Sequence, residues 1–325
     1  MEQDRRSRSD GAGGAAGAPR LGATDAQGAE ALAAGGLVIL PTETVYGLAA
    51  DASNAVAVAA IFEAKGRPRF NPLIAHVADA VEAEAIAVFD DRARALAEAF
   101  WPGPLTIVAP VRDRVRICDL ARAGLNSVAV RVPGHVRARA VISAFGGPVV
   151  APSANRSGRP SPTTFADAME ETGFAAADAV DGGPCAVGVE STVVSVLDGR
   201  VALLRPGSVT REEIEAIVGP LERNGEGHRS PGRAAVHYAP DAPVRINATG
   251  VENGEILLGF GPGVGDPRWS LSPSGDLREA AANLFRRLRE ADRERPAGIA
   301  VSPIPAHGLG EAINDRLKRA TGFVG

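Results

Sequence analysis

Apolar and polar positions follow one another along the chain in short blocks whose periodicity predicts a mixture of strands and helices. Short apolar runs, typical of strands buried in a sheet, occur at 37–41, 72–77, 105–111, 127–133 and 148–153. Segments that begin with a capping residue and carry an apolar face predict helices at 24–34, 54–64, 79–88, 91–100 and 165–171. Runs at 191–197 and 201–206 flank Asp198-Gly199 and predict a hairpin. Many strands with interspersed helices indicate an α/β domain with a mixed sheet.

The pattern divides the chain into four parts. The first 20 residues are polar and rich in Gly and Ala, which predicts a disordered tail before a domain at 21–219. The stretch at 220–242 is polar, contains Gly and Pro and has no periodicity, so it predicts a linker; structureless connections of that length are usually functional or disordered. Strands expected at 244–249, 255–260, 269–273 and 298–304, with helices at 277–290 and 310–320, predict a second, smaller α/β domain at 243–325.

Charge and composition narrow the classes of partner. The formal net charge is −4 and only 4% of the residues are aromatic, whereas proteins that hold nucleic acid by charge are usually basic and readers of single strands stack bases on aromatic rings. The N-terminal segment lacks the apolar core of a secretory signal, and no apolar run approaches the ~18 residues of a membrane span. We therefore expect a cytoplasmic protein with no membrane segment.

Polar and cationic side chains gather where predicted strands and helices end. The segment PTETVYGL at 41–48 carries hydroxyls and an acid, and APSANRSGRPSPTT at 151–164 carries many hydroxyl and amide groups; capping and ordinary polar loops are the alternatives to ligand binding. The segment KGRPRFNPL at 65–73 holds three cations in a loop restrained by proline, which suits phosphate, although a solvated basic loop has the same pattern.

Two single residues extend this picture. Arg131 lies in an otherwise apolar strand, and a charge buried there needs either a partner within the fold or a bound anion. His76 lies in another apolar run, where it is either a core residue with its hydrogen bonds satisfied or a ligand-binding group. With Lys65, Arg67 and Arg205, these residues could form a pocket for a triphosphate and a small polar acid.

Seven motifs occur in the order and spacing of a known family: PTETVYGLAADA, KGRPRFNPL, WPGPLT, SVAVRVPGH, APSANRSGRPSPTT, GVESTVV and LLRPGSVT. From about residue 27 to 215 the chain resembles the YrdC-like family of L-threonylcarbamoyl-adenylate synthases. SPGRAAVHYAP and GLGEAINDRLKRA resemble the linker and C-terminal domain of its long, two-domain form. The resemblance implies a mixed, twisted sheet with a concave basic cavity, followed by a small Rossmann-like domain.

The resemblance also implies a reaction. Such a nucleotidyltransferase converts L-threonine, bicarbonate and ATP to threonylcarbamoyl-AMP and pyrophosphate, and Mg²⁺ accompanies the ATP. The product serves threonylcarbamoyladenosine modification of tRNA through downstream transfer proteins. Because the chain is acidic overall, direct contact with tRNA is expected to be weak or indirect.

The family motifs imply two groups of site residues. The threonine site is expected to contain Thr44, His76, Arg131, Ser153 and Ser191. The ATP site is expected to contain Lys65, Arg67, Asn71, Ser127, Asn155, Ser161 and Arg205, with Thr163 as an alternative to Ser161. Either His237 or Tyr238 is expected to reach back from the linker into this site as part of a lid. Lys65 and Arg67 would supply electrostatic support, and no general base is assigned.

Two other functions compete with this interpretation. An RNA-binding module without catalysis could use a basic cavity, but the acidic total and the scarce aromatic residues argue against it. A carbamoyl transferase of the hydrogenase-maturation type contains a similar domain together with cysteine-rich zinc modules. This chain has only two cysteines, Cys118 and Cys185, without zinc-site spacing.

Overall fold

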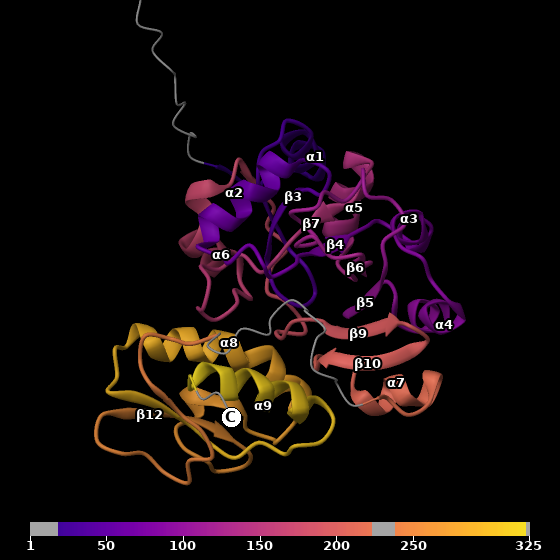
Figure 1. Ribbon diagram of the computed structural model, residues 1–325. Helices are drawn as coiled ribbons and strands as arrows, with labels where there is room; N and C mark the ends of the chain where they lie inside the picture. The colour runs from indigo at the N-terminus through magenta and orange to yellow at the C-terminus, as the bar shows by residue number, and fades with distance from the viewer. Residues whose placement is uncertain (1–18, 223–237, 323–325) are drawn as a thin grey trace, which may run out of the picture.

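The computed structural model describes residues 19–222 and 238–322 (Figure 1). The N-terminal domain is built on a mixed sheet with the order β1-β8-β2-β3-β7-β4-β6-β5-β9-β10. Its strands are β1 (Arg20–Leu21), β2 (Val38–Leu40), β3 (Gly47–Asp51), β4 (Ile74–His76), β5 (Leu105–Pro110), β6 (Ser127–Arg131), β7 (Val149–Val150), β8 (Asp178–Ala179), β9 (Thr192–Leu197) and β10 (Arg200–Arg205). The pairs β4–β6 and β5–β9 are parallel while β5–β6 and β9–β10 are antiparallel, which confirms the mixed sheet.

Helices pack on both faces of this sheet. They are α1 (Asp25–Ala33), α2 (Ala55–Lys65), α3 (Ala80–Ile86), α4 (Asp91–Phe100), α5 (Val136–Phe145), α6 (Phe165–Thr172) and α7 (Arg211–Val218). Because successive strand residues point to opposite faces, Val38 and Leu40 pack into the core with α1 and α5, whereas Ile39 packs into the larger core with α2, α3 and α4. Side-chain caps such as Thr24 and Asn54 accept backbone N–H bonds and so define where α1 and α2 begin.

A second sheet follows the first, with its strands all parallel in the order β11-β14-β12-β13. Its elements are β11 (Val244–Arg245), β12 (Glu255–Phe260), β13 (Ser270–Ser272), α8 (Leu277–Arg293), β14 (Gly298–Val301) and α9 (Leu309–Ala320). The sheet and these helices share a separate core that includes Leu258, Leu271 and Phe285. This is the second, smaller α/β domain that the sequence predicts, and the structure shows that its sheet is parallel.

Several elements differ from the sequence predictions. No strand is predicted at 47–51, but this segment forms β3, because its small residues pair with β2 and β7 deep inside the sheet. The predictions also missed α5 and α7, although Thr210 and Glu213 form a capping box at the start of α7. The strand expected at 244–249 ends at Arg245. The expected disordered tail lies outside the described residues, apart from its last positions.

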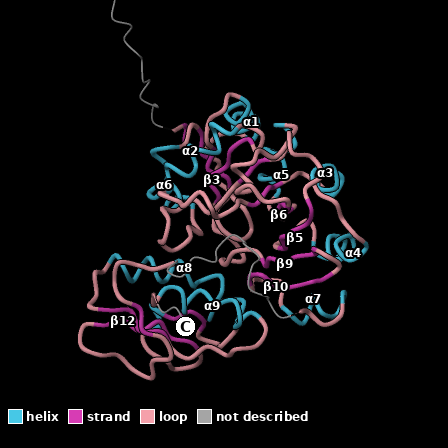
Figure 2. Tube along the Cα trace, viewed as in Figure 1, coloured by secondary structure: helices cyan, strands magenta, loops and turns pink. Residues whose placement is uncertain are grey.

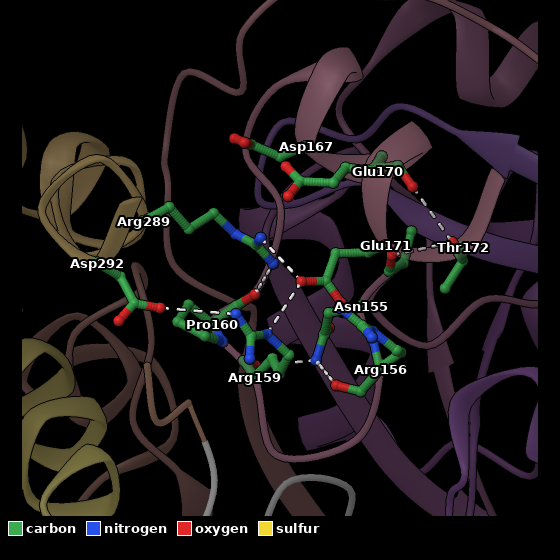
Figure 3. Close-up of polar contacts among 12 residues, drawn as sticks. Asn155, Arg156, Arg159, Pro160, Asp167, Glu170, Glu171, Thr172, Arg289 and Asp292 are labelled. Carbon is green, nitrogen blue, oxygen red and sulfur yellow. Dashed lines mark hydrogen bonds and ion pairs between the residues drawn. The ribbon is translucent and has the colours of Figure 1, made fainter. Parts of the chain in front are cut away.

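The two domains meet through α8 and α9, and Figure 2 shows the loops of the first domain that face these helices. Glu171, at the end of α6, is 2% exposed and accepts hydrogen bonds from Arg289 of α8 at 3.0 Å and from the backbone N–H of Arg156 at 2.9 Å (Figure 3). Arg289 also donates to the carbonyl of Pro160. Since buried charges are tolerated only with their partners, this cluster holds the loop at 155–161 against the C-terminal domain.

Candidate active site

A cavity that opens to solvent lies among strand ends and loops of the first domain. Its lining includes eight of the predicted site residues: Thr44, Arg67, His76, Arg131, Ser153, Ser191, Arg205 and Tyr238. Val45, Leu73, Ile74, Ala151, Pro152 and Glu190 complete it. The structure therefore brings together the five residues predicted for threonine and three of the ten predicted for ATP, from segments spread across most of the chain.

Arg131 ends β6 beside His76 of β4 and is 3% exposed. Its Nε donates to the carbonyl of Gly103 at 3.2 Å, Nη1 to Thr44 Oγ1 at 3.0 Å and Nη2 to Glu43 Oε1 at 2.7 Å. Burial alone would raise the pKa of Glu43, but the charge and hydrogen bond of Arg131 lower it below the usual value. The charge in this apolar strand thus has an ion-pair partner and also faces the cavity.

Glu43 was not among the predicted site residues, although it lies within the motif PTETVYGL. Its neighbour Thr44 is held by Thr42, whose hydroxyl lies 2.8 Å from that of Thr44. Local sequence shows an acid at this turn, but it does not show which of the chain's many cations the acid will meet.

His76 is 2% exposed, and its Nδ1 lies 3.1 Å from the carbonyl of Ile74. Because a carbonyl only accepts, this contact assigns the proton to Nδ1 and leaves Nε2 as a hydrogen-bond acceptor. Burial and the nearby charge of Arg131 lower the pKa of His76 to about 3. The imidazole is therefore neutral at physiological pH, and it can accept a hydrogen bond from a polar ligand.

The lowered pKa of His76 predicts a pH-dependent contribution to stability. The pKa of His76 is about 3 in the folded chain and about 6.5 in the unfolded chain. The stabilisation is therefore fully present above about pH 6.5 and is lost as the pH falls towards 3. Between about pH 7.5 and about pH 5.5 we expect His76 to contribute a loss of about 1.4 kcal/mol in the free energy of unfolding. Urea titrations of the wild type and His76→Asn at both pH values measure it; an equal loss in both proteins would contradict the assignment.

Ser191 and Arg205 form a second polar wall of the cavity. The Ser191 hydroxyl lies 2.7 Å from that of Thr106, and Arg205 Nη2 donates to the Ser191 carbonyl at 2.8 Å and to its hydroxyl at 3.1 Å. The backbone at Gly207 packs closely against the backbone at Thr192. Only glycine fits there, because a Cβ at position 207 would lie 2.3 Å from the backbone nitrogen of Thr192. Arg205 is 4% exposed and lies where a bound anion would meet a fixed guanidinium.

Arg67 lies in the loop after α2 and also lines the cavity. Its Nη2 donates to the carbonyl of Pro72 at 3.2 Å. Part of the side chain is exposed, but Nε is shielded from solvent and has no hydrogen-bond partner among the described residues. Burial of the guanidinium and the nearby charge of Arg205 lower the pKa of Arg67 to about 10, which leaves it cationic. A buried donor without a partner suits a ligand that brings acceptor oxygens.

Lys65 is placed differently from the prediction. It is 3% exposed and does not belong to the cavity lining; its Nζ donates to the carbonyl of Ser153 at 2.5 Å and to that of Asn155. Burial and the charge of Arg67 hold the pKa of Lys65 well below its usual range. In this structure Lys65 therefore supports the turn at 153–155 from behind the cavity wall.

The remaining described residues that were predicted for the ATP site do not line the cavity. Asn155 donates to the carbonyls of Arg156 and Arg159 at 2.7 and 2.9 Å, and Ser161 donates to Glu190; both are fully buried next to the cavity wall. Asn155, Ser161, Asn71, Ser127 and Thr163 are not part of the lining, and His237 lies outside the described residues. Their assignment to an ATP site stays a prediction.

The charges around the cavity are suited to anions. Three arginines line it, opposed by the carboxylate of Glu190. Within 19–222 and 238–322, no group of three or more His, Cys, Asp or Glu side chains is placed to hold a metal ion. Within the same ranges, no helix has the length and apolar character needed to cross a bilayer.

The fold and the cavity define a two-domain α/β protein with an arginine-lined site for anionic ligands. A family model described as Telomere recombination, of the Sua5, YciO and YrdC type, matches residues 30–207, and one described as the C-terminal domain of threonylcarbamoyl-AMP synthase matches 209–322. The chain belongs to the threonylcarbamoyl-AMP synthase family.

Individual relatives are similar over nearly the whole chain. The threonylcarbamoyl-AMP synthase of Bacillus subtilis is 40% identical over 321 residues, which cover 91% of this chain and 92% of the relative. That of Pyrococcus abyssi is 38% identical over 312 residues, covering 89% and 91%. The crystal structure of P. abyssi Sua5 complexed with L-threonine matches with a TM-score of 0.84 at 36% identity and covers 92% of this chain and 94% of that one.

Proposed function

We propose that this protein synthesises threonylcarbamoyl-AMP from L-threonine, bicarbonate and ATP, with release of pyrophosphate. Membership of the family across both domains supports this proposal. The observation that carries it is the cavity itself, which places Arg131 and the hydroxyls of Thr44 and Ser191 together with Arg67 and Arg205. One guanidinium serves the carboxylate of an amino acid and two serve a polyphosphate.

In this proposal, L-threonine occupies the part of the cavity around Arg131. The P. abyssi relative whose structure contains L-threonine has the same fold, which supports L-threonine as a substrate. Arg131 pairs with the carboxylate, Ser153 and Ser191 offer hydroxyls to the polar groups, and the Nε2 acceptor of His76 faces an amine or hydroxyl donor.

ATP occupies the part around Arg67 and Arg205. Lys65 contributes by supporting the turn at 153–155 rather than by touching phosphate. Tyr238 is 1% exposed and lines the cavity, which supports a lid role for the segment at 220–242, of which residues 223–237 lie outside the described part of the chain. Asn71, Ser127, Asn155, Ser161, Thr163 and His237 remain proposed members of this site.

The chemistry needs positioning more than a nucleophilic side chain. The amine of threonine adds to bicarbonate and water leaves, giving a carbamate; a carbamate oxygen then attacks the α-phosphorus and pyrophosphate departs. Fixed arginines stabilise the charge that develops on the departing pyrophosphate. Mg²⁺ accompanies ATP in this proposal, but the described residues offer no metal-binding cluster, so phosphate oxygens and water would hold it.

Pyrophosphate release tests the proposal directly. We expect release from the full-length protein only when ATP, L-threonine and bicarbonate are all present, and no release in buffer freed of dissolved carbon dioxide. Substantial release without threonine would contradict the substrate assignment. Salt-sensitive binding of bulk RNA without any pyrophosphate release would favour an RNA-binding module instead.

We further propose that transfer proteins carry the product to tRNA, with weak or indirect tRNA contact by this chain.

A further inference from the structure

Arg316 of α9 reaches from the C-terminal domain to the wall of the cavity. The side chain is fully buried, with Nε 2.9 Å from Glu190 Oε2 and Nη1 2.9 Å from the carbonyl of Pro206, next to Arg205. Its guanidinium carbon lies 5.5 Å from the ring centre of Tyr238. Arg316 thus contacts two residues of the cavity lining without belonging to the lining itself.

Glu190 places a negative charge in a cavity that otherwise presents arginines. It is 6% exposed, and its two oxygens accept from Ser161 and from Arg316. Burial alone would raise the pKa of Glu190, but the charges of Arg316 first and Arg205 second lower it, so the carboxylate stays ionised. An ionised carboxylate beside a triphosphate site would repel the ligand unless another cation neutralises it.

We propose that Arg316 is a positioning residue that neutralises Glu190 and thereby leaves Arg205 oriented towards the phosphates of ATP. The inference rests on the proposed function and deepens it, because it gives the C-terminal domain a role in nucleotide binding. Arg205 now points its guanidinium at the Ser191 carbonyl and hydroxyl. Without Arg316, Arg205 and the buried Lys65 still lie near Glu190, and an ion pair between Arg205 and Glu190 would draw Arg205 away from the ligand.

The interface offers a matched control. Arg211 of α7 pairs with Glu311 of α9 at 2.7 Å, so it also joins the two domains, but neither residue lines the cavity. Arg211→Met breaks an interdomain ion pair as Arg316→Met does, without changing the charge next to the nucleotide. A loss that comes only from weaker domain docking would therefore appear in both variants.

The test is equilibrium binding by calorimetry, with full-length protein, L-threonine and the α,β-methylene analogue of ATP. We expect Arg316→Met to raise the Kd of the analogue about tenfold or more while the Kd of threonine changes less than about twofold. Adding Glu190→Gln to Arg316→Met should restore the analogue to within about threefold of the wild type, because the unneutralised charge is gone. Arg211→Met should leave both constants at wild-type values.

Arg316→Lys keeps the positive charge at position 316 but removes the guanidinium group, so it tests whether charge alone is sufficient. It also provides a measurement if Arg316→Met does not fold. We expect it to keep analogue binding within about threefold of the wild type, since the cation remains. The inference is overturned if Arg316→Lys binds as weakly as Arg316→Met, if the double variant shows no rescue, or if threonine affinity falls in parallel. A wild-type protein that binds neither ligand would instead reject the proposed function.

Discussion

Arg131→Met is expected to raise the KM for L-threonine by about a hundredfold while the KM for ATP stays near the wild-type value. Arg131 has five N–H donors, and its contacts with other described residues use three of them, which leaves two for a carboxylate. Those contacts already orient the guanidinium, so binding loses little side-chain freedom. Losing two charge-assisted hydrogen bonds accounts for the size of the effect. Pyrophosphate release as a function of threonine concentration measures it.

Removing Arg131 also leaves the carboxylate of Glu43 buried without its cation, which destabilises the fold. The double variant Arg131→Met/Glu43→Gln should recover stability in urea without recovering threonine affinity. Arg122→Met serves as a second control for the loss of a buried arginine, because Arg122 is equally buried but lies outside the cavity. We expect it to leave the KM for threonine near the wild-type value. Full threonine affinity in the stable double variant would show that Arg131 only supports the fold.

Arg67→Met is expected to have the opposite selectivity, with the Kd of ATP raised about a hundredfold and that of threonine little changed. The shielded Nε of Arg67, which has no partner among the described residues, is where phosphate oxygens would accept. Charge-assisted bonds from a guanidinium fork to phosphate are among the stronger hydrogen bonds in proteins. Calorimetry with the α,β-methylene analogue of ATP measures the change.

The same loop supplies the controls for Arg67. Arg69 is two positions away and exposed, so Arg69→Met should bind the analogue nearly as well as the wild type. Arg67→Lys keeps the charge but loses the planar fork, and we expect an intermediate affinity. Equal losses from Arg67→Met and Arg69→Met would mean that general positive charge, rather than this buried donor, attracts the nucleotide.

The sequence predicted most strands and helices, since buried strands and amphipathic helices have periods visible in a single chain. It missed β3 because an alanine-rich segment has little strand preference of its own and pairs only inside the complete sheet. It also assigned Lys65 and Arg67 to one phosphate clamp. Gly66 ends α2 with φ at 59°, so Lys65 stays on the buried face of the helix while Arg67 enters the loop.

What the sequence by itself determined was the chemistry available to the site: the arginines, the hydroxyl-rich turns and the motifs that identify the family. What only the tertiary structure decided was which charges meet. Arg131 pairs with Glu43, which lies 88 positions away in the sequence, and Arg316 pairs with Glu190, which lies 126 positions away. Hydrophobic periodicity is a local property, whereas a buried ion pair depends on how distant elements pack, so no local pattern contains it. Arg131 is both paired with Glu43 and part of the cavity lining, whereas the sequence alone could not distinguish an internal ion pair from a bound anion.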